Sequence, residues 1–280
     1  MTDRLAGYLA VLGLSENPGA RLAAGQFHDV VLAAEVAYRF PRNEDSRRKL
    51  PAACELLATL GDCGLPAAIP RLLDTSHLDR PLVRSHAAVS LLPGAPLAAG
   101  LSQHAQEAAA NQLAGLLDQL AAAASDERLL RLVPGAPRWV DFAASVRQVL
   151  FPLMSAEGRR RAEAELAAAC ELAPGGHALV HTDLGGNNLL WSSDGDGLPR
   201  LTGVLDWDGA VIGNQASDLA SIAVTVGWPL AERIDDLRRA GPPLMAEARV
   251  VAATFALQQA LPAALGKDKP NLDDGLTGYR

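Results

Sequence analysis

Residues 178–191 read ALVHTDLGGNNLLW, in which two apolar runs flank a polar segment that contains a pair of glycines. The polar segment carries Asp183 and Asn188, and a second apolar stretch farther along, LTGVLDWD, carries Asp206. The sequence SSDGDGLP between the two stretches is typical of a tight turn and predicts a β-hairpin. We therefore expect an amide and two carboxylates to come together near the ends of short strands.

These three polar side chains suit the transfer of a phosphoryl group. That reaction needs a carboxylate to accept the proton of the attacking hydroxyl, and oxygen ligands to hold Mg²⁺ against nucleotide phosphates. Asp183 is the expected base, while Asn188 offers a neutral oxygen ligand and Asp206 a charged one. The Gly185-Gly186 pair lets the backbone turn tightly between base and ligand, because neither residue has a Cβ.

Two other interpretations fit parts of the pattern. Any one of these residues alone is more often a polar side chain at a strand end, and a lone histidine in an apolar segment is usually a satisfied core residue. We therefore expect His181 to support the loop by packing or hydrogen bonding. A metal-dependent hydrolase would also use histidine and aspartate, but the segment lacks a second clustered histidine, and asparagine is a poor zinc ligand.

Composition narrows the class of protein further. A chain of 280 residues with 49% hydrophobic and 20% charged residues can bury two modest cores. Its net charge of −7 argues against nucleic acid as a partner and suits a cationic ligand. Cys54, Cys63 and Cys170 form no CxxC pair, which is typical of a reducing cytosol. With neither a signal-peptide pattern nor an apolar run long enough to span a membrane, we expect a cytoplasmic protein without a membrane partner.

The first part of the chain predicts a small lobe rich in strands. A helix is expected over 3–14, followed by a β-hairpin made by VVLA and EVAYRF. The charged residues 42–49 are expected to form an exposed connection to a helix that has Pro51 in its first turn. After HAAVSLLPG, a further apolar strand, the chain is expected to leave an N-lobe that covers residues 1–93 and binds nucleotide.

The remaining residues, 94–280, predict a mostly helical C-lobe that contains the catalytic loop and the substrate site. Apolar residues recur there at three- and four-residue spacing, as in AQEAAANQLAGLLDQLAAAA. One long helix is expected over 243–265, followed by a polar tail, 268–280. Asp218 stands at a helix start, where we expect a cap or a buried brace for the catalytic loop. The predicted fold class is therefore α+β with two lobes.

A second set of residues is expected to bind the nucleotide. A strand cation followed by a helix acid can form an ion pair that orients phosphates, and here these residues are Arg39 and Glu55. The backbone near Ser90 and Leu92 is expected to border the cleft and to hydrogen-bond adenine. Taken singly, Arg39 and Glu55 are also compatible with ordinary exposed charges.

HTDLGGNN with VLDWD, followed by GNQASDLA, resembles the aminoglycoside phosphotransferase family, whose bilobal fold is similar to that of protein kinases. Within that family, LFPLMSAEGRRRAEAEL, FALQQAL and DGLTGYR look like the phosphotransferases of the tuberactinomycins viomycin and capreomycin. The resemblance implies ATP as co-substrate, Asp183 as catalytic base and Asn188 and Asp206 as Mg²⁺ ligands.

The resemblance also implies a substrate, a cationic cyclic-peptide antibiotic that is phosphorylated on a hydroxyl, with resistance as the result. Asp208, two residues after the metal-binding Asp206, is the candidate for holding a substrate amine, and a turn or cap residue is the alternative. Family members commonly have a lysine where this chain has Arg39, and Arg42 is a second candidate for the phosphate contact.

Two alternatives stay open within this family. In the first alternative, the substrate is another small molecule, such as an aminoglycoside, a macrolide or a metabolite. The catalytic motifs do not distinguish these substrates. The other alternative is a non-catalytic, nucleotide-binding pseudokinase, which the missing lysine favours and the intact Asp183, Asn188 and Asp206 oppose.

Overall fold

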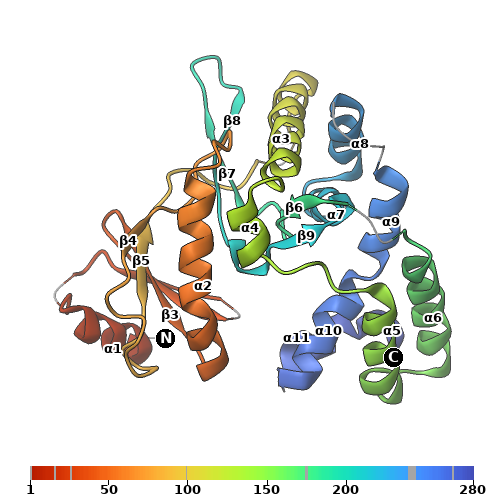
Figure 1. Ribbon diagram of the computed structural model, residues 1–280, viewed down its shortest axis with the longest axis horizontal. Helices are drawn as coiled ribbons and strands as arrows, with labels where there is room; N and C mark the ends of the chain where they lie inside the picture. The colour runs from red at the N-terminus through yellow and green to blue at the C-terminus, as the bar shows by residue number, and fades with distance from the viewer. Residues whose placement is uncertain are drawn as a thin grey trace. The chain divides into compact units, whose positions relative to one another are not determined.

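The computed structural model describes residues 2–15, 17–25, 27–98, 100–173, 176–238, 244–266 and 268–280. Their contacts define two compact units, each assembled from segments that are distant in sequence. Unit 1 contains Met1–Gln112, Ser125–Val133 and Asn187–Gly209, and unit 2 contains Leu113–Ala124, Pro134–Gly186 and Ala210–Arg280. One unit is built on an antiparallel sheet and the other is mostly helical, which confirms the α+β class (Figure 1).

The centre of unit 1 is a five-stranded antiparallel sheet in the order β1-β2-β3-β5-β4. The predicted hairpin is its middle, with His28 opposite Pro41 and Ala33 opposite Val36. Buried and half-buried residues alternate along β2 from Asp29 to Ala33, as the pleat favours, whereas β3 ends in two consecutive buried residues, Phe40 and Pro41. The strands are β1 Arg21–Ala24, β2 His28–Ala33, β3 Val36–Pro41, β4 Leu72–Asp74 and β5 Ala87–Ser90.

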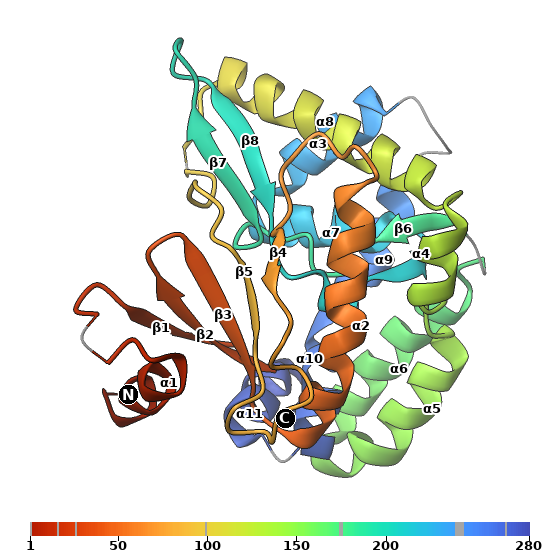
Figure 2. The same cartoon turned by 60° about the vertical axis from the view of Figure 1, so that its left-hand side comes forward.

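Helix α1, Thr2–Leu12, covers one part of this sheet, where Leu9 packs with Val31 and Phe40. Figure 2 shows α1 beside β1 and β2. Helix α2, Glu44–Gly61, packs against β3 and β4 and contributes Leu50 and Cys54 to a second small core.

The sequence predicts that this helix starts near Pro51, but α2 begins seven residues earlier, at Glu44. The prediction of an exposed connection at 42–49 is therefore wrong. The Asn43 side chain accepts a hydrogen bond from the Ser46 N–H at 2.8 Å and caps the helix. Glu44 and Asp45 in the first turn complement the helix dipole. The charged residues therefore form the solvent-facing turns of a helix, and Pro51 lies inside it.

The predicted hairpin of the catalytic segment is present in unit 1 as β7, Leu189–Ser193, and β8, Pro199–Val204. It joins the rest of the unit through short bridges, Ala95 to Trp191 and Ala68 to Gly203. The short 3₁₀ helix η2, Trp207–Gly209, follows, and α4, Glu127–Leu132, contacts α2.

Unit 2 is mostly helical, with a two-stranded sheet made by β6, Ala178–Val180, and β9, Val211–Gly213. Leu150, Leu166, Leu257 and Tyr279 are members of a buried apolar cluster in this unit. Helix α3 contributes its C-terminal part. The helices are α3 Gln103–Ala123, α5 Trp139–Val149, η1 Phe151–Leu153, α6 Ala156–Cys170, α7 Ala216–Thr225, α8 Trp228–Leu237, α9 Met245–Ala253, α10 Phe255–Gly266, α11 Lys269–Gly275 and η3 Thr277–Tyr279.

One prediction for the C-terminal region is wrong. The long helix over 243–265 is two helices, because the chain breaks at the buried Thr254, whose hydroxyl donates to the Val251 carbonyl at 2.7 Å. The polar tail, for which no secondary structure is predicted from the sequence, forms α11 and η3, and Tyr279 is only 1% exposed. The buried Tyr279 hydroxyl donates to the Glu165 carboxylate of α6 at 2.5 Å.

Among the described helices, none combines the length and the apolar character needed to traverse a bilayer.

Candidate active site

The loop after β6 carries the predicted base in unit 2, and helix α7 holds its backbone. Asp218 of α7 is fully buried and accepts hydrogen bonds from the N–H groups of His181, at 3.1 Å, and Thr182, at 2.9 Å. Thr182 has a φ of +71°, which non-glycine residues seldom adopt. The Asp218 side chain therefore holds a strained turn one residue before Asp183.

Burial is the main influence on the pKa of Asp218, which it raises to about 7, and the nearby Asp183 adds to the increase. The two N–H groups from the loop oppose this increase. The carboxyl group that holds the loop therefore titrates near neutral pH.

Asp183 itself is exposed, whereas His181 is completely buried. The Asp183 N–H donates to His181 Nδ1 at 3.3 Å, so this ring nitrogen acts as an acceptor and its proton is on Nε2. His181 is thus buried and hydrogen-bonded to the loop, and Asp183 is an exposed residue whose backbone N–H this hydrogen bond holds.

Helix α7 makes two further contacts with the loop that the sequence does not reveal. The Gly186 N–H donates to Thr225 Oγ1 at 2.9 Å, and the Ser221 hydroxyl donates to the Thr182 carbonyl at 3.3 Å. A Cβ on Gly185 would lie 3.1 Å from Thr225 Cγ2, so the loop packs tightly on the helix there. The spacing of Asp218, Ser221 and Thr225 places them on one face of α7, and this spacing was the available signal.

The predicted metal ligands, Asn188 and Asp206, belong to unit 1 and flank the same end of the β7–β8 hairpin. Leu189 is opposite Val204 in the register, and the Leu205 N–H donates to the Asn188 carbonyl at 2.9 Å. Asp206 has a φ of +59°, a second strained non-glycine position in the catalytic segments. The hairpin thus brings together two residues that are distant in sequence.

The residues at this hairpin end fit a magnesium ion. Amide and carboxylate oxygens are hard ligands, and Mg²⁺ commonly takes few protein ligands because it retains water and shares phosphate oxygens. Partial desolvation and the neighbouring Asp208 raise the pKa of Asp206, and Arg39 lowers it. Excess negative charge around Asp206 is an environment that a cation would stabilise. In the described parts of the chain, no group of three or more histidine, cysteine, aspartate or glutamate residues is placed to bind a metal.

Arg39 does not form the expected ion pair with Glu55. Its guanidinium donates to the Asp208 carboxylate, and His28 Nδ1 lies 3.4 Å from both side chains. Glu55 is exposed on α2 and forms no salt bridge with any described residue. The neighbouring Cys54 is buried instead. Burial raises the pKa of its thiol to about 11, while the charge of Arg39 lowers this pKa and that of Asp208 raises it. One step along a helix rotates a side chain by about 100°, so the register of α2 turns Glu55 outward.

Arg42, the second candidate for a phosphate contact, is engaged elsewhere in unit 1. Its side chain donates to the Gly25 carbonyl at 2.7 Å and lies 3.8 Å from the buried Asp29 carboxylate. These contacts tie the end of β3 to the connection that precedes β2.

Ser90 and Leu92, the candidates for adenine binding, differ in whether their backbone groups already form hydrogen bonds. The Ser90 N–H donates to the Arg71 carbonyl at 2.8 Å, and the Ser90 hydroxyl accepts from the Arg71 N–H at 2.9 Å. No hydrogen bond joins the Leu92 backbone to any described residue. Leu92 therefore retains both a donor and an acceptor, whereas Ser90 fixes the strand that leads to it.

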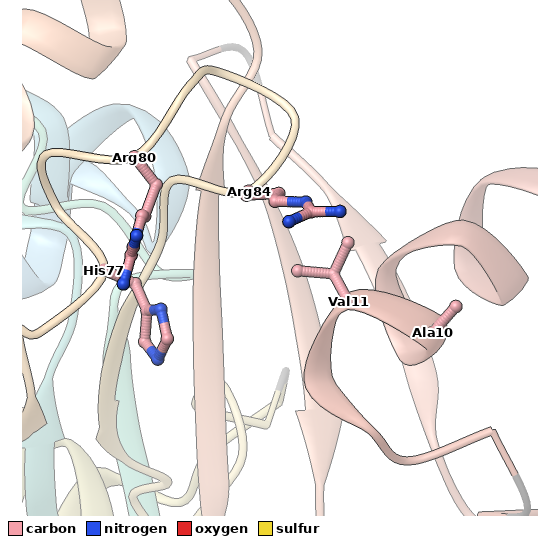
Figure 3. Close-up of a pocket in the computed structure, with 5 residues that line it drawn as sticks. All are labelled: Ala10, Val11, His77, Arg80 and Arg84. Carbon is pink, nitrogen blue, oxygen red and sulfur yellow. The ribbon is translucent and has the colours of Figure 1, made fainter.

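A cavity of about 550 Å³ in unit 1 lies apart from these residues. Ala10 and Val11 of α1 and three basic residues of the segment before β5 line it: His77, Arg80 and Arg84 (Figure 3). No predicted site residue is among them.

The pattern of the phosphotransferase enzyme family matches residues 21–260 of this chain. The chain belongs to this family. The sequence of this phosphotransferase is 40% identical over 267 residues to that of viomycin phosphotransferase from Streptomyces vinaceus. The match covers 94% of this chain and 93% of that protein. This confirms the family resemblance that the catalytic motifs predict.

Solved structures confirm the kinase-like fold of this phosphotransferase. An aminoglycoside phosphotransferase solved with GDP and kanamycin superposes with a TM-score of 0.80 at 18% identity, covering 99% of this chain and 97% of that one. A macrolide 2′-phosphotransferase from Brachybacterium faecium gives a TM-score of 0.66 at 24% identity, with 97% of each chain covered.

Proposed function

We propose that this phosphotransferase transfers the γ-phosphate of ATP to a hydroxyl of a cationic cyclic-peptide antibiotic of the viomycin and capreomycin type, and thereby confers resistance. The observation that carries this proposal is the 40% identity with viomycin phosphotransferase, which extends over 94% of the chain and so far beyond the catalytic segments. The net charge of −7 suits a substrate with several positive charges. We place the reaction in the cytoplasm, where ATP and reduced cysteines are found.

In this proposal Asp183 is the catalytic base. It accepts the proton of the antibiotic hydroxyl as the new oxygen–phosphorus bond forms and the bond to the leaving ADP breaks. Two observations support this role: the Asp183 carboxylate is exposed, and its backbone N–H is anchored on His181. A fixed base adjacent to a bound hydroxyl lowers the entropic part of the barrier.

Asn188 and Asp206 would hold Mg²⁺, whose charge, when the ion is bound, offsets that of the nucleotide phosphates. We further propose that residues 1–93 form the nucleotide-binding lobe and 94–280 the lobe that binds the antibiotic. Leu92 is the proposed contact to adenine, because its backbone groups make no hydrogen bonds with the described residues.

The amine-binding role expected of Asp208 is not retained, because its carboxylate already accepts from Arg39. Glu55 is likewise not retained as the partner of Arg39.

Mass spectrometry of the antibiotics provides the decisive test. Purified protein is incubated with ATP, Mg²⁺ and either viomycin or capreomycin, and the Asp183→Asn variant is treated identically as the control. We expect both antibiotics to gain the mass of one phosphoryl group with the wild-type protein and to remain unmodified with the variant.

A panel with kanamycin and a macrolide distinguishes the alternatives. Phosphorylation of one of these, with viomycin and capreomycin unchanged, would replace the proposed substrate class. Nucleotide binding without transfer to any acceptor would indicate a pseudokinase, and hydrolysis with zinc or manganese in the absence of ATP would indicate a hydrolase.

A further inference from the structure

Arg39 stands at a central position of the five-stranded sheet, opposite Val30 of β2 and Ala87 of β5. From there its guanidinium reaches Asp208 of η2, which comes much later in the chain. All of these residues belong to unit 1. The ion pair therefore connects the rigid sheet to the short helix that follows the predicted metal ligand Asp206.

Arg39 is the more buried partner of the pair, whereas Asp208 belongs to an exposed part of η2. The Arg39 side chain is 12% exposed and that of Asp208 is 21% exposed. His28 Nδ1 lies 3.4 Å from the Asp208 carboxylate, and α2 packs against both β3 and η2. The hydrogen bond is charge-assisted, and removing Asp208 would leave the largely buried Arg39 guanidinium without this partner.

Asp206 needs support of this kind because of its backbone. A φ of +59° is unfavourable for a residue with a Cβ and persists only where neighbouring contacts hold it. The ring N–H of Trp207, which is 1% exposed, donates to the Val204 carbonyl at 3.2 Å, so this contact spans Asp206. Two residues after Asp206, the Arg39 contact holds Asp208. The turn at Asp206 is thus held by one contact across it and by a second contact just after it.

We infer that Arg39 is a positioning residue for the metal ligand: it binds Asp208, and through Asp208 it keeps Asp206 in the conformation that binds Mg²⁺, without contacting phosphate itself. This inference rests on the proposed phosphotransferase function.

A double-mutant cycle in nucleotide binding tests the inference. Arg39→Gln, Asp208→Asn and the double variant are titrated with ATP by fluorescence or calorimetry, first without divalent metal and then over a range of Mg²⁺ concentrations. We expect each single variant to raise, by about tenfold or more, the Mg²⁺ concentration at which the gain in ATP affinity is half complete. Loss of a residue that supports a metal ligand commonly weakens metal binding to this extent. Affinity for metal-free ATP should change by less than about twofold, and the double variant should be no worse than the singles.

The opposite pattern would overturn the inference. If Arg39 contacts phosphate, Arg39→Gln weakens binding of metal-free ATP, and its effect adds to that of Asp208→Asn. Asp208→Asn is nearly isosteric, so it reports on the pair even if Arg39→Gln is unstable. Arg21→Gln, at an exposed position of β1 in the same sheet, is the matched control and should leave both affinities unchanged.

The same experiment separates this inference from the proposed substrate. Nucleotide binding is measured without antibiotic, so failure to phosphorylate viomycin or capreomycin leaves the test of Arg39 intact. If the wild-type protein binds no ATP with or without Mg²⁺, both the proposed function and this inference are wrong.

Discussion

Asp183 combines an exposed carboxylate with a backbone that its neighbours immobilise. Replacing Asp183 with asparagine keeps the size of the side chain and the N–H bond to His181, but removes the proton acceptor. We expect turnover to fall by about 10²- to 10⁴-fold, while ATP affinity and the melting temperature stay unchanged. Steady-state kinetics with a thermal unfolding control measure this, and near-normal turnover in a folded variant would exclude Asp183 as the base.

Asp218 predicts a dependence of stability on pH. Its pKa is raised to about 7 in the fold, so between the ordinary value near 4 and about pH 7 the folded state keeps a proton that the unfolded state has lost. The unfolding free energy contributed by Asp218 is therefore present at low pH and is lost as pH rises through this range, at up to about 1.4 kcal/mol per pH unit. Above about pH 7 the contribution is constant.

Chemical denaturation of the wild-type protein and Asp218→Asn between about pH 5 and pH 8 measures the effect. The variant cannot titrate at this position, so its stability should fall less steeply with pH than that of the wild type. Parallel curves would show that Asp218 is ionised throughout.

Helix α6 packs so closely on the C-terminal η3 that only glycine fits at the contact. A Cβ on Gly158 would lie 1.9 Å from the Tyr279 carbonyl oxygen, a backbone atom that cannot move alone. We expect Gly158→Ala to destabilise the protein by about 1–3 kcal/mol, as overpacking does. Gly115→Ala in α3 is the control, because no atom lies within 4 Å of its added Cβ; it should stabilise by about 0.5–1 kcal/mol. Thermal unfolding compares the two, and equal effects would contradict the packing argument.

Elements with a strong local signal could be predicted from the sequence, and those that depend on tertiary packing could not. The β2–β3 hairpin follows from two runs of strand-forming residues, and the β7–β8 hairpin from two apolar runs joined by a turn sequence. Residues 42–49 were expected to form a connection because they are charged, yet a solvated helix face has the same composition. The tail likewise looked polar, although Leu276 and Tyr279 are three residues apart and both are buried.

The candidate site shows the same distinction. Asp183, Asn188 and Asp206 carry a motif within a short part of the chain, so the sequence was sufficient to propose them. The partner of Arg39 was not predictable, because Asp208 is distant in sequence and Glu55 occupied the position that a kinase-like pattern suggests. The contacts of Thr225 and Ser221 with the loop are also tertiary, and the local sequence indicates only that these residues share a helix face with Asp218.

Over the whole molecule, 32 acidic residues outnumber 25 lysines and arginines, and the proposed substrate carries several positive charges. Long-range attraction between them should concentrate the antibiotic near the protein, and salt screens it over a Debye length of about 8 Å at physiological ionic strength. We therefore expect the KM for capreomycin to rise by about two- to tenfold between low salt and about 0.15 M NaCl, with kcat unchanged. The KM for anionic MgATP, measured in the same assays, should not rise in parallel, because the net charge of the protein repels it. A capreomycin KM that is insensitive to salt would mean that the antibiotic is recognised by short-range contacts alone.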